Sequence, residues 1–155
     1  MKKIVLIITI LSMSLFAEKM TYQTTKNQYI QINNNDGKFE FVNLKYKNKD
    51  TLLFFFGSHC PVCEGEMPDI KRLARENNLK IIGIHGQDFI GDPALKAFVK
   101  KERLNFDVLS FRDDINLINY CKDNGMWSGE VPLHVLVDKK GNVKVVKFSE
   151  ILSKY

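Results

Sequence analysis

Two cysteines separated by two residues, Cys60 and Cys63, give this 155-residue chain its clearest capacity for chemistry. They follow residues 52–56, a short, aromatic-rich apolar run closed by Gly57, which predicts a buried strand. Pro61 favours the first turn of a helix, where its missing N–H needs no partner. The pattern therefore predicts a strand, a short turn and a helix that begins at the first cysteine.

A cysteine at a helix N-terminus has a stabilised thiolate, because the unpaired backbone N–H groups and the helix macrodipole favour negative charge there. We therefore expect Cys60 to be the nucleophile. Cys63, one turn further into the helix, can attack the Cys60 sulfur and resolve a mixed disulfide. The spacing thus indicates dithiol redox chemistry.

Two other interpretations of the cysteine pair stay open, half of a zinc site and a purely structural disulfide. A structural zinc site needs four ligands. The remaining candidate ligands form no second close pair in the sequence; they are Cys121, His59, His85 and His134. We therefore prefer the redox interpretation to either alternative.

The composition is that of an ordinary globular domain, with 45% hydrophobic and 26% charged residues. The N-terminus differs, because a basic tripeptide precedes the almost wholly apolar residues 4–16 and the small residue Ala17. This pattern predicts a signal peptide over residues 1–17, cleaved near Ala17, with an uncleaved membrane anchor as the alternative. Disulfides persist outside the reducing cytosol, so we expect a periplasmic location.

Residues 18–155 are then expected to form one domain. Loss of residues 1–17 leaves 21 basic against 18 acidic residues, a net charge of +3, which is too weak to indicate nucleic-acid binding. Strand and helix signals alternate along this domain. The predicted elements are, in chain order, a loose leader over 18–28, strands 29–32 and 39–42 around a turn, strand 52–56, helix 61–77, strand 80–85, a helix from 92 to about 103, strand 105–109, a helix capped by 113/114, strand 133–137, a hairpin turn into strand 143–148, and one or two helical turns from 149.

This order resembles the thioredoxin layout, and more closely the TlpA/ResA/CcmG-like thiol–disulfide oxidoreductases. Residues 56–68, Phe-Gly-Ser-His-Cys-Pro-Val-Cys-Glu-Gly-Glu-Met-Pro, are similar to the W-C-x-x-C-x-x-E-x-P stretch of that family. Residues 92–109 look like its inserted helix and strand, and residues 131–141 look like its cis-proline strand and hairpin. The resemblance implies an α/β thioredoxin fold: a central mixed sheet flanked by helices, with an N-terminal β-hairpin and a central helix–strand insertion.

The resemblance also implies roles for five residues. It makes Cys60 the exposed nucleophile, Cys63 the resolving thiol and Glu66 the active-site acid. It makes Pro132 a cis-proline that faces the cysteine pair, and it makes Val131 a contact for the substrate backbone. A partly buried carboxylate near Cys63 would have a raised pKa and could accept the proton of that thiol.

Two further residues are candidates for substrate binding. His59 stands where the family has tryptophan, and a cationic imidazole beside Cys60 would lower the pKa of that thiol and make the disulfide more oxidising. An exposed histidine without a role is the alternative. Trp127, in the loop before Pro132, either helps to form a substrate groove or packs in the core.

Three other residues are given structural roles. Cys121 falls on the apolar face of its predicted helix and is expected to be a buried, inert thiol. His134 lies within a central strand and is expected to be a core histidine whose hydrogen bonds are satisfied. His85 ends a strand, where a local structural role is favoured over catalysis.

The function implied by the resemblance is reduction of disulfides in exported proteins, such as the haem-attachment cysteines of apocytochrome c. A membrane thiol transporter of the DsbD/CcdA kind would recharge the dithiol, and no organic cofactor or metal is required. A second hypothesis is a disulfide oxidase or isomerase, because a proline after the first cysteine and a histidine before it fit an oxidising poise. A third is a copper-binding metallochaperone, in which two thiolates hold Cu(I) and His59 or His85 adds a ligand.

Overall fold

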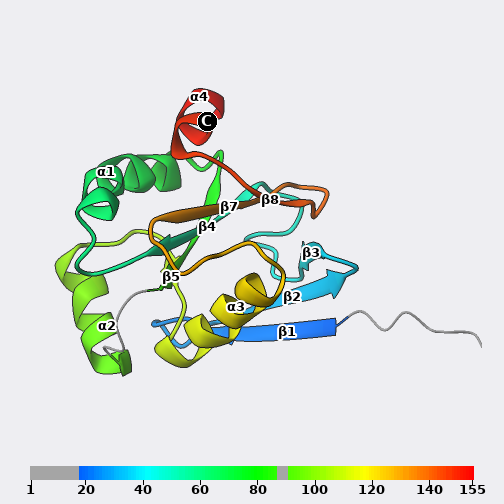
Figure 1. Ribbon diagram of the computed structural model, residues 1–155, viewed down its shortest axis with the longest axis horizontal. Coiled ribbons are helices and arrows are strands. Elements are labelled where there is room, and N and C mark those ends of the chain that lie inside the picture. The colour runs from blue at the N-terminus through cyan, green and yellow to red at the C-terminus, as the bar shows by residue number, and fades with distance from the viewer. Residues whose placement is uncertain (1–17, 87–90) are drawn as a thin grey trace, which may run out of the picture.

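The structure is a computed structural model that describes residues 18–86 and 91–155 (Figure 1). Its helices and strands are, in chain order, β1 (Glu18–Gln23), β2 (Tyr29–Asn35), β3 (Lys38–Phe41), β4 (Thr51–Phe56), α1 (Pro61–Glu76), β5 (Lys80–His85), α2 (Gly91–Lys101), β6 (Asp107–Val108), α3 (Phe111–Asp123), β7 (Leu133–Val137), β8 (Val143–Val145) and α4 (Phe148–Lys154). The predicted signal peptide lies outside the described residues. Within the described ones, no helix combines the length and apolar character needed to cross a bilayer.

The strands form two sheets. One has three antiparallel strands in the order β1-β2-β3, and the other has five strands in the order β6-β5-β4-β7-β8. In the larger sheet β4, β5 and β6 run parallel, while β7 and β8 pair antiparallel. A mixed central sheet, an N-terminal hairpin and an inserted helix and strand (α2 and β6) are therefore all present, as expected.

Strand β4 lies at the centre of the larger sheet, and all six of its residues are buried. Successive side chains of a strand point to opposite faces. Leu52, Phe54 and Phe56 accordingly pack with residues of α1, α2 and α4 on one face. Leu53 and Phe55 pack with residues of the three-stranded sheet and α3 on the other. Because both faces are covered, β4 reads as a continuous apolar run rather than as an alternating one.

The expected loose leader over residues 18–28 is wrong for its first part, which forms β1. The strand is largely polar, so its sequence carries little strand signal, but β2 supplies a complete antiparallel partner. Tyr22 is buried in the core, and the Gln23 N–H donates to Asp113 Oδ2 at 2.6 Å, which joins β1 to α3. The turn between β2 and β3 is tighter than expected, because only Asp36 and Gly37 separate the two strands. Both residues have positive φ.

Three predicted boundaries also differ from the structure. Helix α3 begins at Phe111, and Ser110 rather than Asp113 occupies the N-cap position. The Asp113 carboxylate accepts from the Ser110 hydroxyl at 2.9 Å. Strand β6 contains only two residues and β8 ends at Val145. The predicted α1 is confirmed; it continues through Pro68 and ends before Asn77, which has left-handed backbone geometry.

Two glycines allow a matched test of this backbone. Gly141 has φ +84°, and an added Cβ would lie 2.9 Å from the Phe39 backbone oxygen. Gly65 lies on the exposed side of α1 with no neighbouring atom within 4 Å of an added Cβ. We expect Gly141→Ala to lower the free energy of unfolding by about 2 kcal/mol. We expect Gly65→Ala to raise it by about 0.5–1 kcal/mol, because alanine loses less conformational entropy in a helix.

Urea denaturation of both variants measures these changes. A destabilised Gly65→Ala variant or a neutral Gly141→Ala variant would contradict the backbone geometry described.

Candidate active site

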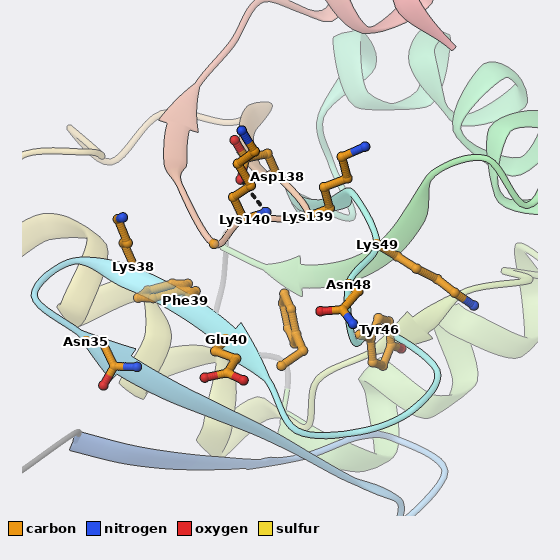
Figure 2. A pocket seen from close by; sticks show the side chains of 12 residues that line it. Asn35, Lys38, Phe39, Glu40, Tyr46, Asn48, Lys49, Asp138, Lys139 and Lys140 are labelled. Carbon is orange, nitrogen blue, oxygen red and sulfur yellow. Dashed lines mark hydrogen bonds between the residues drawn. The ribbon is translucent and has the colours of Figure 1, made fainter.

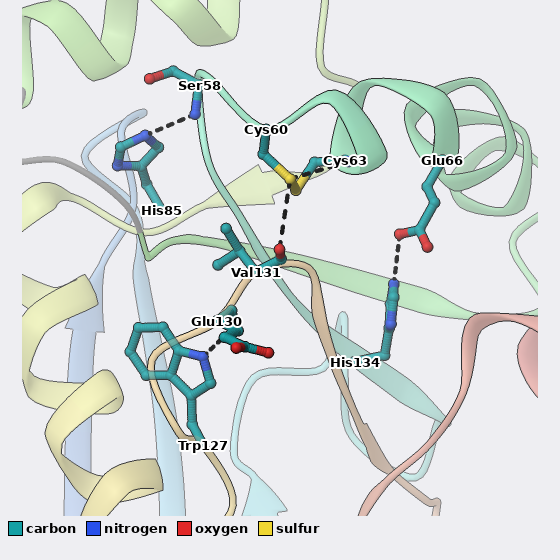
Figure 3. The surroundings of a disulfide bond; sticks show 9 residues. All are labelled: Ser58, Cys60, Cys63, Glu66, His85, Trp127, Glu130, Val131 and His134. Carbon is teal, nitrogen blue, oxygen red and sulfur yellow. Dashed lines mark hydrogen bonds and ion pairs between the residues drawn. A yellow bond between two sulfur atoms is a disulfide. The ribbon is translucent and has the colours of Figure 1, made fainter.

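Cys60 and Cys63 are joined by a disulfide, with their Cα atoms 5.2 Å apart, so the structure represents the oxidised protein (Figure 3). The pair lies where the sequence predicts, between the end of β4 and the first turn of α1. Cys60 is the N-cap residue of α1, and its Sγ accepts a hydrogen bond from the Cys63 N–H at 3.1 Å. Once the disulfide is reduced, the same N–H and the helix N-terminus stabilise a Cys60 thiolate.

The burial of the disulfide differs from the expectation. Cys60 was expected to be exposed, but its exposed fraction is only 5%, against 1% for Cys63. The segment before β7 crosses the disulfide and places the Val131 carbonyl oxygen 3.7 Å from Cys60 Sγ (Figure 3). This tertiary contact is invisible in the local sequence. Cys60 is the less buried of the two cysteines, which agrees with its assignment as the attacking one.

The Val131–Pro132 peptide bond is cis, as predicted. The cis bond directly precedes β7, and the turn that carries Cys60 directly follows β4. Strands β4 and β7 pair antiparallel, so these two segments adjoin neighbouring strands. Val131 and Pro132 are both partly exposed beside the disulfide. They are therefore placed where a substrate chain could contact them.

Trp127 supports the segment that contains Val131 and Pro132. Its ring packs against Phe55 with the centroids 5.6 Å apart, and its Nε1–H donates to the Glu130 carbonyl oxygen. Gly86 leaves room for the Trp127 ring and the Val131 side chain, since an added Cβ would lie 3.2 Å from both. The placement of Trp127 in the core favours the packing alternative over a substrate groove.

Glu66 lies three residues after Cys63, so the two side chains are neighbours on one face of α1. Its Oε2 is 2.9 Å from His134 Nε2 on β7 (Figure 3). Burial raises the pKa of Glu66 to about 7 and lowers the pKa of His134 to about 4. Between about pH 4 and 7 both groups are uncharged, so in that range the contact is a hydrogen bond between neutral groups.

The raised pKa of Glu66 confirms the expectation made for this carboxyl. The sequence prediction that His134 is a satisfied core histidine is confirmed, but its partnership with Glu66 was missed. Pro132 directly precedes β7 and His134 lies two residues further on, a spacing that places side chains on the same face of an extended chain, which was the available signal.

His59 is exposed, and its Nδ1 lies 3.2 Å from the Ser58 hydroxyl. It lies at a hollow of about 600 Å³ between α1 and α2 that also reaches Cys63. The wall combines apolar and charged side chains, among them Met67, Phe98 and Lys101. His59 is therefore placed where it could contact a substrate, and its exposure also fits the alternative of a histidine without a role.

His85 and Cys121 have the structural settings expected of them. His85 is buried at the end of β5, and its Nε2 accepts from the Ser58 N–H at 3.3 Å (Figure 3). This bond ties the cysteine turn to the neighbouring strand. Cys121 is buried in α3, and burial raises the pKa of its thiol to about 12, so the thiol is unreactive at neutral pH.

A second hollow, of about 250 Å³, lies at the opposite end of β4 and β7 (Figure 2). Four lysines surround it, and Figure 2 shows their side chains pointing in different directions rather than toward one ligand position; they are Lys38, Lys49, Lys139 and Lys140. The Asp138 carboxylate is occupied by the hairpin turn, where it accepts from the Asn142 side chain at 2.7 Å. In residues 18–86 and 91–155, no three His, Cys, Asp or Glu side chains converge as a metal site would require.

A match to a protein-family model identifies the family of this chain. The family model described as "AhpC/TSA family" matches residues 24–146, which include the disulfide, Glu66 and the cis-proline. The chain belongs to the AhpC/TSA family. The matched residues run from just after β1 to just after β8, so they include most of the described domain rather than one motif within it.

Curated relatives of this chain include proteins named "Thiol-disulfide oxidoreductase ResA". The protein of Bacillus cereus is 31% identical over 134 residues, covering 83% of this chain and 71% of the relative. That of Geobacillus thermodenitrificans is 29% identical over 106 residues, covering 65% of this chain and 55% of the relative. The chain therefore spans about half the length of the Geobacillus relative. The predicted resemblance to ResA-like proteins is confirmed.

Similar solved structures confirm the thioredoxin fold. StoA from Bacillus subtilis superposes with a TM-score of 0.59 at 16% identity, over 90% of this chain and 97% of that one. A putative thioredoxin from Neisseria meningitidis superposes with a TM-score of 0.61 at 20% identity, over 91% and 87%. At these identities the comparison establishes the fold alone.

Proposed function

We propose that this protein is an exported thiol–disulfide oxidoreductase that reduces disulfides of exported proteins. One observation carries the proposal: the Cys60–Cys63 disulfide lies at the N-terminus of α1, against the cis-proline segment. Relatedness to proteins named thiol-disulfide oxidoreductase supports the reaction type. The apolar N-terminal segment of the sequence supports export.

The reaction begins with the reduced protein. The Cys60 thiolate attacks one sulfur of a substrate disulfide, so a Cys60–substrate bond forms, the substrate S–S bond breaks and one substrate thiolate leaves. Cys63 then gives its proton to the Glu66 carboxylate and attacks Cys60 Sγ. The Cys60–Cys63 bond forms, the second substrate thiolate leaves, and two electrons have passed to the substrate.

The substrate and the electron donor belong to the same proposal. The hollow between α1 and α2, with His59 at its edge, and the Val131–Pro132 segment lie on two sides of the disulfide and offer contacts for a polypeptide substrate. Haem-attachment cysteines of apocytochrome c are the proposed substrate. A membrane thiol transporter of the DsbD/CcdA kind is the proposed donor that returns the protein to its dithiol form.

The reduction potential of the Cys60–Cys63 pair tests the direction of electron flow. We expect a value near about −270 mV, as in thioredoxin, when the protein is equilibrated in a dithiothreitol series. A Cys121→Ser variant should give the same value and excludes a contribution from the third thiol. A value near about −120 mV, as in the strong oxidant DsbA, would overturn the reductant proposal and favour the oxidase or isomerase. Stoichiometric Cu(I) binding without turnover would favour the metallochaperone.

A further inference from the structure

The contact between Glu66 and His134 joins the two elements that form the active site. Glu66 belongs to α1, which carries both cysteines, and His134 belongs to β7, which follows the cis-proline. Their side chains are 15% and 7% exposed, and the atoms Oε2 and Nε2 are 2.9 Å apart. Figure 3 shows the two side chains pointing toward one another across the space between helix and strand.

Two phenylalanines hold the imidazole of His134 in one plane. The Phe54 ring of β4 stacks on it with centroids 5.5 Å apart and planes 17° apart. The Phe148 ring, at the start of α4, stacks at 5.1 Å and 20°. Stacking on both faces fixes the plane of the imidazole, and the hydrogen bond to Glu66 selects the orientation of Nε2 within that plane.

Other ionisable groups on the surrounding elements are directed elsewhere. On α1, Asp69 pairs with Arg72 at 3.4 Å on the surface of the helix. Beside Phe148, Lys147 is exposed and Glu150 lies 3.9 Å from Lys144. Strand β4 contributes only uncharged side chains. Cys63, one turn before Glu66 and bonded to Cys60 in this state, is the thiol that faces the same side of α1.

A proton acceptor in a partly buried site has to be accommodated both with and without its proton. A neutral carboxyl needs an acceptor for its O–H, and a carboxylate needs a donor. An unsatisfied buried group costs about 1–3 kcal/mol. A neutral imidazole can be either partner, because its single proton resides on Nδ1 or on Nε2.

We propose that His134 is a positioning residue that keeps Glu66 hydrogen-bonded in both protonation states by changing tautomer. With Glu66 protonated, the carboxyl donates to a bare Nε2. With Glu66 ionised, Nε2 carries the imidazole proton and donates it to the carboxylate. The inference deepens the proposed function, on which it rests for the role of Glu66 in accepting the Cys63 proton.

The pKa values of the pair agree with this exchange. Because the pKa of His134 is lowered to about 4, the imidazole stays neutral throughout the range in which Glu66 titrates near its pKa of about 7. A cationic partner would instead hold Glu66 ionised and remove its ability to take up a proton at neutral pH.

Nitrogen NMR of the 15N-labelled full chain in its oxidised form tests the exchange directly. We expect His134 Nε2 to be unprotonated at pH 5 and protonated at pH 9, with the change coinciding with titration of the Glu66 carboxyl followed by 13C NMR. A single neutral tautomer across this range would overturn the proposal. So would an imidazolium paired with an ionised Glu66 at pH 5.

Two substitutions separate positioning from simple packing. His134→Gln retains a donor and an acceptor, and we expect the Glu66 pKa to stay within about half a unit of its wild-type value. His134→Leu has neither, and we expect the pKa to rise by about one unit, a tenfold lower ratio of carboxylate to carboxyl at a given pH. Equal shifts in the two variants would overturn the proposal.

If the leucine variant does not fold, the NMR measurement on the wild-type protein decides alone. Failure of the proposed function remains distinguishable, because a chain without reductase activity could still show the tautomer change. Loss of the tautomer change in an active reductase would remove only the role of His134.

Discussion

Replacing Cys60 by serine is expected to lower the rate of disulfide reduction at least about 1,000-fold. A serine hydroxyl at this position cannot form the mixed disulfide, and Cys63 is the more deeply buried of the two cysteines. Reduction of a peptide disulfide, with dithiothreitol regenerating the protein, measures the loss. Cys121→Ser is the matched control and should retain the wild-type rate, since Cys121 is buried away from the disulfide in α3.

The companion variant Cys63→Ser separates the two sulfur roles. It retains the attacking thiol and lacks the resolving one, so the mixed disulfide between Cys60 and the substrate should accumulate and be visible by mass spectrometry. If Cys60→Ser kept full activity, or if the trapped adduct formed on Cys63, the assignment of Cys60 as the nucleophile would be wrong.

Glu66→Gln is expected to slow resolution of the mixed disulfide by about 100-fold. Glutamine has nearly the shape of glutamate but cannot take up the Cys63 proton. Because the pKa of Glu66 is about 7, the carboxylate that accepts this proton is populated above pH 7, and the wild-type rate should rise with pH through this value. Single-turnover release of substrate thiol across pH 5–9 measures both effects.

The matched control for this experiment is Asp69→Asn. It removes one negative charge from the same helix, at a carboxylate that pairs with Arg72 on the surface. We expect it to leave the rate and its pH dependence unchanged. An unaltered inflection near pH 7 in Glu66→Gln would show that another group is responsible.

The Glu66→Gln substitution also changes the free energy of unfolding, and the sign of this change follows from the pKa of Glu66. The pKa of Glu66 is raised from 4.5 to about 7, so the folded protein binds its proton more tightly than the unfolded chain does. The resulting stability is fully present below pH 4.5 and is lost as the pH rises through 7. Relative to Glu66→Gln, the wild-type protein should therefore lose up to about 3 kcal/mol between pH 4.5 and 8. The lowered pKa of His134 has the opposite sign, and it largely cancels in this difference because both proteins contain His134.

Features with a strong local pattern were predictable from the sequence. The apolar run before Gly57, the proline after Cys60 and the helical spacing in α1 all report on residues close together in the chain, so the cysteine turn was placed correctly. The β7–β8 hairpin was also found, because Pro132 precedes it and Gly141 lies in its turn. The short α4 agrees with the one or two helical turns predicted from residue 149.

Features that depend on a distant partner were less accessible. Strand β1 is polar and becomes a strand because β2 offers backbone groups to pair with. Helix α3 starts earlier than its acidic residues suggest, because Asp113 bonds to Gln23 of β1 as well as to Ser110. In both elements, tertiary contacts outweighed a weak local preference.

The sequence by itself therefore determined the reactive pair, its place at a helix N-terminus, and the acid and proline expected near it. Only the tertiary structure decided that the Val131 segment buries Cys60 and that His134 meets Glu66. These contacts join residues about 70 positions apart in the chain. Their existence depends on how α1 and β7 pack around β4, whereas helix and strand patterns encode only each element's own burial.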